Sequence, residues 1–469
     1  MFCKIKLHSS EKNSTFAVLI DLKSTLRQKM DTICAISTPY GCGGIAVVRV
    51  SGEQAIALTD SLFRGTGSLV DAPANTIHFG RIERDGEMLD EVLVSVFRAP
   101  HSFTGEDVVE ISCHGSLYIQ QELLHWLIEA GCRMAKAGEF TQRAFLSGKL
   151  DLAEAEAVAD LIASQSKAEK DLALSQLRGS VSGELQGLRE RLLHFTSLVE
   201  LELDFADHEE LEFADRTQLN TLAQEIEHKL DLLIRSFRTG NAIRNGVPVA
   251  IVGATNAGKS TLLNALLGEE RAIVSDIRGT TRDTIEDTLI INGVQFRLID
   301  TAGIRQTGDR LESMGIERSR QAAQTAQIIV QVIDSTDPQI DLQGIDLTGK
   351  TLLQVWNKTD LVQENTPSSA LHISAKQGDV EGLKETLARV AAEQIETNAV
   401  TISNARHYEA LVRALEAIRR VQTGLQTGLS GEFLTMDLQD CQNALGEITG
   451  QITSQEVLNN IFSHFCIGK

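Results

Sequence analysis

A short glycine-rich segment carries the residue types that hold nucleotide phosphates. The segment Gly253-Ala-Thr-Asn-Ala-Gly258-Lys259-Ser260 follows the apolar run VPVAIV and precedes the helical pattern TLLNALLG. This is the strand–loop–helix setting of the GxxxxGK[ST] pattern, in which backbone N–H groups and the helix N-terminus face the phosphates. Lys259 would offset the charge of the β- and γ-phosphates, and Ser260 would place its hydroxyl on Mg²⁺. The segment therefore predicts a nucleoside triphosphate site.

Two polar segments that follow later apolar strands predict selection of guanine. Asn357-Lys358-Thr359-Asp360 ends the run TLLQVW, and Ser374-Ala375-Lys376, which can brace the base, ends the next strand. Asp360 would accept two hydrogen bonds from the N1–H and the exocyclic amine that guanine presents and adenine lacks. A site built on such bonds can reject the wrong ligand by about 10⁴-fold, because its polar group is otherwise left unpaired.

The segments between these two predict hydrolysis of the bound nucleotide. Asp300-Thr-Ala-Gly303 ends an apolar strand, where the carboxylate would reach Mg²⁺ through water and Gly303 would meet the γ-phosphate. Thr280 and Thr281 lie in a polar loop, where a threonine can complete the magnesium shell. Ile304 follows where many small GTPases carry the glutamine that orients water, so another group must position that water.

Composition limits the class of protein. The chain has 469 residues, of which 42% are hydrophobic and 23% charged, which is typical of a soluble globular protein of two to four domains. We find no apolar run near the roughly 18 residues that cross a bilayer. The net charge of −20 argues against nucleic-acid binding by overall attraction. Seven scattered cysteines favour free thiols in a reducing compartment, so we expect a cytoplasmic protein without a membrane partner.

Hydrophobic patterning predicts a multidomain α/β protein in which a helical region is interrupted by an inserted α/β domain. In the first domain we expect strands over Thr76–Arg81, Glu91–Phe97 and Val108–Ser112, with a helix near Ile119–Ala130. The expected division of the chain is a disordered extension over 1–29, an α+β domain over 30–147, a first helical part over 148–243, an α/β domain over 244–397 and a second helical part over 398–469.

From residue 32 to residue 469 the chain resembles the MnmE (TrmE) family of tRNA-modification GTPases. The resemblance rests on TPYGCGGIAVVRVSG, SFTGEDVVEISCHG, AGEFTQRAFLSGKLDLAEAEAVADLI, GATNAGKSTLLNALL, GTTRD, DTAGIR, ESMGIERS, NARH and the terminal FCIGK. It implies an N-terminal tetrahydrofolate-binding domain, a discontinuous helical domain that ends in the CIGK motif, and a Ras-like P-loop GTPase domain inserted into it. The chain departs from the family at Thr255, where proline is usual, and at Cys42, where arginine is frequent.

The resemblance also implies roles in the nucleotide site. The family uses a potassium ion instead of an arginine finger, and Asn256, Ser275, Ile277 (through its main chain) and Thr280 match that ion site. Ser260 and Thr281 match the magnesium ligands. Glu312 matches the glutamate that positions the attacking water, which makes it catalytic together with Lys259. The GTP-binding set is then Asn256, Ala257, Gly258, Lys259, Ser260, Thr261, Ser275, Asp276, Ile277, Arg278, Gly279, Thr280, Thr281, Asp300, Thr301, Ala302, Gly303, Asn357, Lys358, Asp360, Ser374, Ala375 and Lys376.

For the N-terminal domain the resemblance implies folate chemistry and protein partners. Arg49, Glu106, Lys149 and Lys469 match folate-contacting positions. The family forms a homodimer and joins an FAD-containing partner, MnmG (GidA), in a heterotetramer or larger complex. With a tetrahydrofolate one-carbon donor, it adds a carboxymethylaminomethyl or aminomethyl group to C5 of the wobble uridine of certain tRNAs.

Three residues keep a plainer interpretation beside the functional one. Cys466 lies in the terminal motif and is a candidate catalytic nucleophile, but a free cysteine is more often a small buried hydrophobe. Arg49 and Glu106 would, without the resemblance, be ordinary surface ion-pair residues. His114, in the sequence SCHG, is interpreted as a turn residue and not as a metal ligand.

Two other functions compete with this one. The first is a ribosome-assembly or RNA-binding GTPase of the same superfamily, although such proteins carry a basic RNA-binding module that this acidic chain lacks. The second is a scaffold that binds nucleotide without hydrolysing it. Affinity for 5-formyl-tetrahydrofolate separates the first alternative, and potassium-stimulated hydrolysis separates the second.

Overall fold

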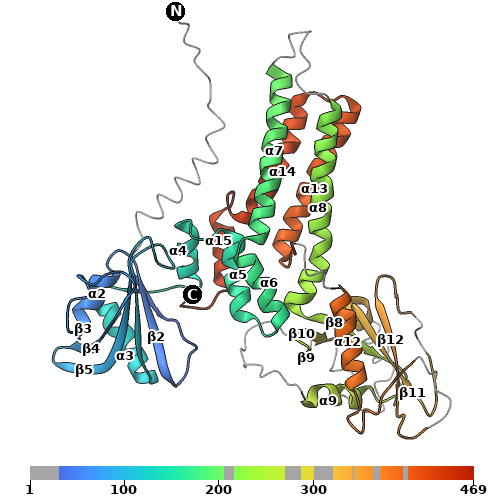
Figure 1. Ribbon diagram of the computed structural model, residues 1–469, viewed down its shortest axis with the longest axis horizontal. Coiled ribbons are helices and arrows are strands. Elements are labelled where there is room, and N and C mark those ends of the chain that lie inside the picture. The colour runs from blue at the N-terminus through green and yellow to red at the C-terminus, as the bar shows by residue number, and fades with distance from the viewer. Residues whose placement is uncertain are drawn as a thin grey trace, which may run out of the picture. The chain divides into compact units, whose positions relative to one another are not determined.

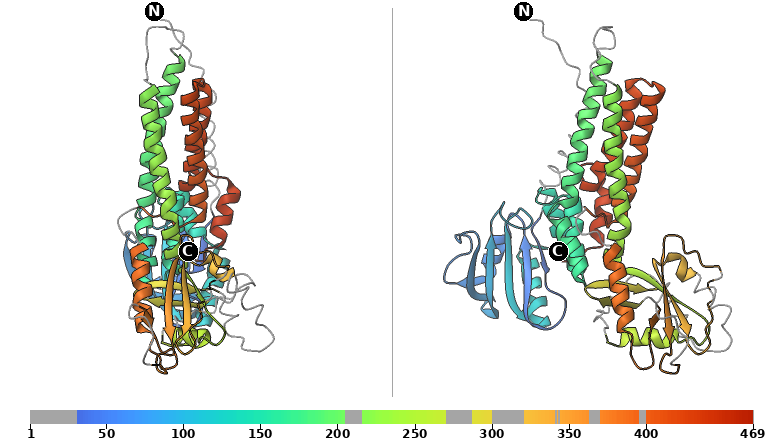
Figure 2. Two further views of the ribbon diagram at one scale, coloured as in Figure 1. Left: turned by 90° about the vertical axis from the view of Figure 1, so that its right-hand side faces the viewer. Right: turned by 45° about the vertical axis from the view of Figure 1, so that its right-hand side comes forward.

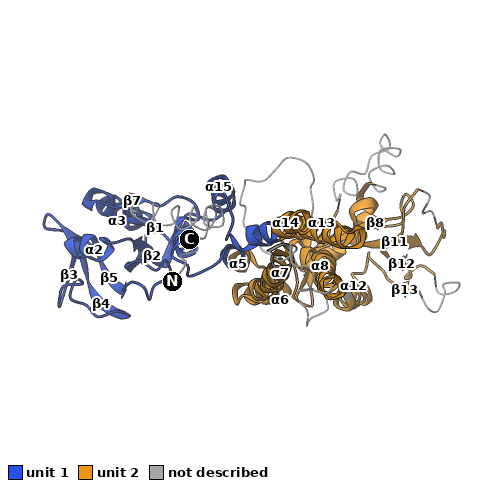
Figure 3. Ribbon diagram, turned by 90° about the horizontal axis from the view of Figure 1, so that it is seen from above, with its two compact units in different colours: residues 1–159, 442–469 blue, residues 160–441 orange. Residues whose placement is uncertain are grey.

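The computed structural model describes residues 31–204, 216–269, 287–299, 321–340, 342, 344–362, 370–394 and 400–468. The chain divides into two compact units, residues 1–159 with 442–469, and residues 160–441 (Figure 3). The extension over 1–29 lies outside the described residues, and the domain limits expected from the sequence remain a prediction. Among the described residues, no helix is long and apolar enough to cross a membrane.

A mixed sheet of seven strands forms the centre of the first unit, in the order β3-β4-β5-β6-β2-β1-β7 (Figure 1). Its pairs are antiparallel except β1 with β7, which is parallel. The three expected strands and the expected helix are present, and all four are longer than the sequence suggests. The strands are β1 (Ile33–Ile36), β2 (Gly43–Ser51), β3 (Phe63–Gly65), β4 (Thr76–Arg84), β5 (Glu87–Phe97), β6 (Val108–Gly115) and β7 (Arg133–Met134).

Helices cover one face of this sheet because its strands alternate buried and exposed side chains. Apolar residues of α2 (Ala55–Leu62) and α3 (Leu117–Ala130) join those of the strands in one core. Helix α3 ends at Gly131, whose φ of 121° favours glycine. A smaller cluster joins α4 (Glu139–Leu146) and the start of α5 (Leu152–Ala163) to α15 (Gln455–Ser463) through Phe145, Leu152, Leu458 and Phe462.

The second unit contains a six-stranded sheet in the order β13-β12-β11-β8-β10-β9, which is parallel except for the edge strand β9. Every residue of β8 is buried, as expected for a central strand covered on both faces. One face packs against α9 (Lys259–Glu269) and α12 (Glu381–Gln394), and the other against Ala322, Ala323 and Ala326. The strands are β8 (Val247–Val252), β9 (Asp287–Ile291), β10 (Val294–Leu298), β11 (Ile328–Asp334), β12 (Thr351–Asn357) and β13 (Leu371–His372).

Long helices that precede and follow this sheet in the sequence pack together into a bundle (Figure 2). Helix α8 leads directly into β8, and the chain returns after α12 to start α13, so the sheet domain is an insertion in the helical region. Two of these helices begin at residue types that favour the N-cap position. The Ser166 side chain accepts from Glu169 N at the start of α6, and the Asn404 side chain accepts from Arg406 N at the start of α13. The helices are α6 (Lys167–Leu177), α7 (Ser180–Asp204), α8 (Arg216–Asn245), α13 (Ala405–Thr427) and α14 (Gly431–Thr449).

Candidate functional site

The phosphate loop lies between the end of β8 and the start of α9, as the sequence predicts. Its backbone adopts left-handed conformations at Gly253 (φ 149°), Asn256 (φ 63°) and Gly258 (φ 97°). A Cβ atom at Gly253 would overlap the Val332 carbonyl oxygen, and one at Gly258 would overlap Nδ2 of Asn357. Both glycines are therefore needed for close packing as well as for their backbone angles.

Lys259 occupies the first turn of α9 and turns back over the loop. Its Nζ donates to the carbonyl oxygens of Gly253 and Ala254, at 2.8 Å each. Burial lowers the pKa of Lys259, because these neutral carbonyls do not fully replace the water that a charged ammonium loses. A bound phosphate would supply the missing negative charge.

We expect Lys259→Met to leave the nucleotide-free protein at least as stable as the wild type at pH 7. The pKa of Lys259 is lower in the folded than in the unfolded protein, so the free energy of unfolding rises with pH until the pH exceeds the pKa of the unfolded state. At neutral pH the protonated lysine therefore costs stability. Methionine keeps the apolar stem without that charge. Thermal unfolding without and with GDP checks this: GDP should raise the melting temperature of the wild type and leave that of the variant unchanged.

The exposed Lys170 provides the control for this measurement, since its side chain is 50% exposed and pairs with Asp171. Lys170→Met should respond to GDP like the wild type. A nucleotide-free Lys259→Met protein that melts well below the wild type would contradict the expectation.

The remaining described residues of the loop lie where the pattern puts them. Ala257 is buried, Ser260 is partly buried in the first turn of α9, and Asn256 and Thr261 are exposed. Ser260 thus stands at the helix N-terminus beside Lys259, where a hydroxyl could meet a metal ion held by the phosphates.

At the carboxyl end of β12, Asn357 joins the phosphate loop to the second predicted base-binding segment. Its side chain is buried, Nδ2 donates to the Ala257 carbonyl at 2.9 Å, and Oδ1 accepts from Ala375 N at 3.1 Å. Nearby, Ser374 Oγ donates to Oδ1 of the exposed Asp360 at 2.7 Å. Lys376 follows in an exposed turn. Segments far apart in sequence therefore meet at one edge of the sheet, as a single nucleotide site requires.

Lys358 has a partner that the sequence analysis missed. Its backbone is left-handed (φ 65°), and its Nζ lies 2.5 Å from Oδ2 of Asp334, at the end of the neighbouring strand β11. Burial alone would raise the pKa of Asp334, but hydrogen bonds from Lys358 and Thr336 hold it below its ordinary value. The signal in the sequence was an apolar strand, IIVQVID, that ends on a carboxylate at the same sheet edge.

Other predicted residues of the nucleotide site lie outside the described residues, and their roles remain predictions. They are Ser275, Asp276, Ile277, Arg278, Gly279, Thr280, Thr281, Asp300, Thr301, Ala302, Gly303 and Glu312.

In the first unit, two of the predicted folate residues carry ion pairs, but not with one another. Arg49 pairs with Glu110 at 2.8 Å, and its guanidinium lies 5.6 Å from the ring centroids of Phe103 and Phe140. Glu106 pairs with Arg143 at 3.0 Å. The exposed Lys149 passes close to Gly105, the residue before Glu106: its Cε lies 3.7 Å from where a Cβ on that glycine would stand. The fourth residue, Lys469, lies outside the described residues.

The terminal segment reaches the same unit. The Cys466 carbonyl accepts from Gly138 N at 3.3 Å, Ile467 bridges to Ala137, and the Gly468 carbonyl accepts from Ser37 Oγ at 3.1 Å. Cys466 itself is exposed, so the interpretation as a small buried hydrophobe does not apply. Its role as a nucleophile stays a prediction.

The interpretation of His114 as a turn residue is wrong. His114 lies in β6, which continues to Gly115 because that glycine packs directly on the backbone of Gly43 in β2. Its ring Nδ1 lies 2.7 Å from Asp90 Oδ1, and its backbone N–H donates to Asp90 Oδ2 at 2.8 Å. Among the described residues, no group of three or more His, Cys, Asp or Glu side chains could hold a metal ion.

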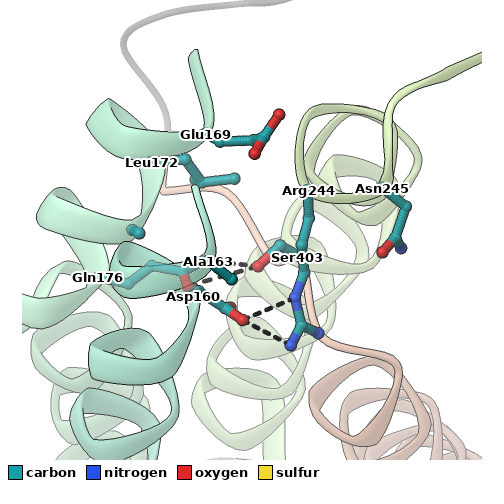
Figure 4. A pocket seen from close by; sticks show the side chains of 9 residues that line it. Asp160, Ala163, Glu169, Leu172, Gln176, Arg244, Asn245 and Ser403 are labelled. Carbon is teal, nitrogen blue, oxygen red and sulfur yellow. Dashed lines mark hydrogen bonds and ion pairs between the residues drawn. The ribbon is translucent and has the colours of Figure 1, made fainter. Parts of the chain in front are cut away.

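A cavity of about 380 Å³ lies in the second unit (Figure 4). The residues that line it are not among the predicted GTP-binding residues. Arg244 donates to Asp160 Oδ1 through Nε and Nη2, at 3.0 and 2.7 Å, and Gln176 donates to Ser403 Oγ at 3.0 Å. Arg244 lies in the last turn of α8, just before the sheet domain begins, and Ser403 lies in the segment after the sheet domain, just before α13. These hydrogen bonds therefore attach both connections of the sheet domain to α5 and α6.

Comparison with known proteins identifies the family. The model of the GTP-binding protein TrmE N-terminus matches residues 32–149, and that of the MnmE helical domain matches residues 152–466. A tRNA modification GTPase MnmE of Parabacteroides distasonis is 54% identical over 94% of this chain and 100% of its own, and one of Bacteroides thetaiotaomicron is 51% identical over 94% and 99%. The solved G domain of the T. maritima FeoB iron transporter is 23% identical, covering 32% of this chain and 98% of its own, with a TM-score of 0.23. On the sequence matches, the chain belongs to the MnmE family of tRNA modification GTPases.

Proposed function

We propose that this chain hydrolyses GTP and acts in the modification of tRNA. The observation that carries the GTP part of the proposal is the double hydrogen bond of Asn357, which ties the phosphate loop to the segment Ser374-Ala375-Lys376 beside Asp360. One small molecule can then touch the phosphate-binding amides and the guanine-selecting carboxylate together. The tRNA part rests on the sequence matches to tRNA modification GTPases. Mass analysis of tRNA nucleosides from cells that lack the gene tests the tRNA part, and unaltered wobble uridines would contradict it.

We further propose that hydrolysis depends on Mg²⁺ and K⁺. Ser260 and Thr281 would hold the magnesium ion, and Asn256, Ser275, Ile277 and Thr280 the potassium ion. The position of Asn256 supports this assignment. The residue has a left-handed backbone in the phosphate loop, and its side-chain amide is exposed where the loop would hold the phosphates. Glu312 would position the attacking water, since Ile304 cannot.

GTP hydrolysis is expected to be faster in K⁺ than in Na⁺, by up to the roughly 10³- to 10⁵-fold that a neutralising cation such as an arginine finger supplies. Asn256→Ala should lose the difference, but alanine also strains a backbone with φ of 63°. Asn256→Gly accepts that backbone and lacks only the side chain, so it separates the two effects. Equal wild-type rates in both salts, or a glycine variant that keeps the potassium response, would count against the ion site.

For the first unit we propose a folate site and a role in dimerisation. Arg49, Glu106 and Lys149, with Lys469, would bind a tetrahydrofolate one-carbon donor, and a cationic and a carboxylate group suit the glutamate tail and the pterin ring. The sheet face opposite α2 and α3 carries exposed apolar side chains among polar ones, which supports a homodimer contact. Cross-strand register places on that face Ile45, Ile77, Phe79 and Leu93, exposed by 70, 68, 64 and 48%.

The complete reaction would need the FAD-containing partner MnmG (GidA), in a heterotetramer or larger complex. Together the two proteins would add a carboxymethylaminomethyl or aminomethyl group to C5 of the wobble uridine in the cytoplasm. The net charge of −20 supports a division of labour in which the partner supplies much of the attraction for tRNA.

A further inference from the structure

The carboxylate of Glu106 is held from one side by buried groups. Arg143 is 3% exposed, and its Nη1 donates to Glu106 Oε2 at 3.0 Å and to Oε1 at 3.3 Å. The hydroxyl of the fully buried Ser51 donates to Oε2 at 2.8 Å. Oε2 therefore accepts two short bonds, whereas Oε1 accepts one long bond and keeps lone pairs for another donor. The Glu106 side chain is 19% exposed, so a ligand can reach it.

A chain of hydroxyl groups fixes the same carboxylate, and the direction of each bond can be assigned. Ser51 uses its hydrogen on Glu106, so in the 2.8 Å contact between Ser51 Oγ and Thr104 Oγ1 the threonine must donate. Thr104 Oγ1 in turn accepts from the Glu106 backbone N–H at 3.3 Å. The chain starts and ends on one residue, and Ser51 and Thr104 are both fully buried. Such a closed set of bonds restricts the rotation of the carboxylate.

Arg143 itself is anchored by a second set of partners. Its Nη2 donates to the Asp31 carbonyl at 2.8 Å and to Glu139 Oε1 at 3.2 Å. The guanidinium thus bridges the segment before β1, helix α4 and the loop that carries Glu106. A planar group held at several points sets the plane of the carboxylate that it binds.

We propose that Arg143, assisted by Ser51 and Thr104, is a positioning residue that aims the remaining lone pair of Glu106 Oε1 at the 2-amino group of a pterin ring. The 2-amino-4-oxopyrimidine ring of a pterin presents N3–H and the 2-amino group side by side, the same donor pair that guanine offers to Asp360. A carboxylate already fixed in direction accepts a hydrogen bond from the 2-amino group without losing rotational freedom. The inference rests on the proposed folate site and adds the groups that make its carboxylate selective.

Arg133 provides a matched control, because it shares the network without touching Glu106. It binds Asp31 at 2.6 Å and Glu139 at 2.6 Å, the two residues that also anchor Arg143. A role limited to holding the fold together would leave the preference for a ligand with the 2-amino group unchanged in variants of either arginine. A positioning role lowers that preference at Arg143 alone.

The test measures binding of 5-formyl-tetrahydrofolate, and of its analogue without the 2-amino group, to the full-length chain. In the wild type, removal of the amino group should weaken binding by about tenfold or more, the range for hydrogen bonds to charged groups. Arg143→Gln should weaken binding of the parent ligand by a similar factor and reduce the difference between the two ligands. Arg143→Lys should recover part of that difference, and Arg133→Gln should keep all of it.

The outcomes separate the inference from the proposed function. A wild-type chain that binds neither ligand overturns the folate site, and the inference with it. A wild type that discriminates between the ligands, together with a folded Arg143→Gln variant that discriminates equally well, overturns the positioning role alone. If Arg143→Gln does not fold, Ser51→Ala decides, since it breaks the hydroxyl chain and leaves every charge in place: lost discrimination supports the role, and unchanged discrimination overturns it.

Discussion

Asp360→Asn should exchange the preference of this chain for guanine nucleotides with one for xanthine nucleotides. Guanine places two donors opposite Asp360, and an amide answers them with one acceptor and one donor, so one pair of N–H groups would clash. Xanthine carries an oxygen in place of the exocyclic amine and fits the amide. The geometry is favourable, because Ser374 Oγ donates to Asp360 Oδ1 at 2.7 Å and would orient the amide oxygen in the same way.

The expected loss of GDP affinity is about 10⁴-fold, since a polar site rejects a ligand that leaves its groups unpaired. Equilibrium binding of GDP and xanthosine diphosphate to the full-length variant measures the exchange. Asp379→Asn makes the same chemical change at the far end of the turn over residues 375–378, where the Asp379 backbone carbonyl accepts from Ser374 N at 3.2 Å. It should leave both affinities unchanged. An Asp360→Asn variant that still prefers GDP would show that another group reads the base.

The parts of the site that could be predicted from sequence are those in which local pattern fixes structure. A glycine-rich turn between a buried strand and a helix can hardly form another arrangement, and the loop from Gly253 to Lys259 lies where expected. Polar segments after parallel strands collect at one sheet edge for the same reason. This places Asp360 and Ser374 together, although many residues separate them in the chain.

Side-chain partners were missed because they depend on register and on tertiary packing. Arg49 lies opposite Glu110 only in the pairing of β2 with β6, and a shift of one residue would put them on different faces. The family motif singled out Glu106, but nothing in its spacing points to Arg143, which arrives from helix α4. The strand β3 and the helices α2 and α4 were also not expected. They are short, with 3, 8 and 8 residues, so periodicity over a longer window does not detect them.

His114 illustrates the opposite error, in which a local pattern misleads. A glycine after a polar residue usually indicates a turn, and Gly115 invited that interpretation. In the fold this glycine allows two strand backbones to approach closely, since a Cβ there would overlap the carbonyl oxygen of Gly43. The sequence cannot distinguish a glycine needed for a turn from one needed for close contact.

Asn357→Ala should disconnect the two halves of the nucleotide site. The buried Asn357 side chain satisfies the Ala257 carbonyl and the Ala375 N–H, and both of those residues are also buried. Alanine leaves one acceptor and one donor without these partners, at about 1–3 kcal/mol for each. We expect GDP affinity to fall by about 30- to 1,000-fold, because binding must then restore an order that the wild type already has.

Two further variants show whether this loss comes from the bridge or from damage to the strand. Asn357→Asp keeps an acceptor for Ala375 N–H but places a carboxylate oxygen against the Ala257 carbonyl, so it should fail about as severely as alanine. Gln354→Ala, three residues earlier in β12, removes an exposed side chain that donates to Oε1 of the buried Gln331 at 3.0 Å. It also costs fold stability, but it lies outside the bridge and should bind GDP normally. Hydrogen exchange then locates the change, with faster exchange at Ala375 N–H in both Asn357 variants relative to wild type. Normal GDP binding by Asn357→Ala would mean that the phosphate loop and the base-binding segment hold their positions independently.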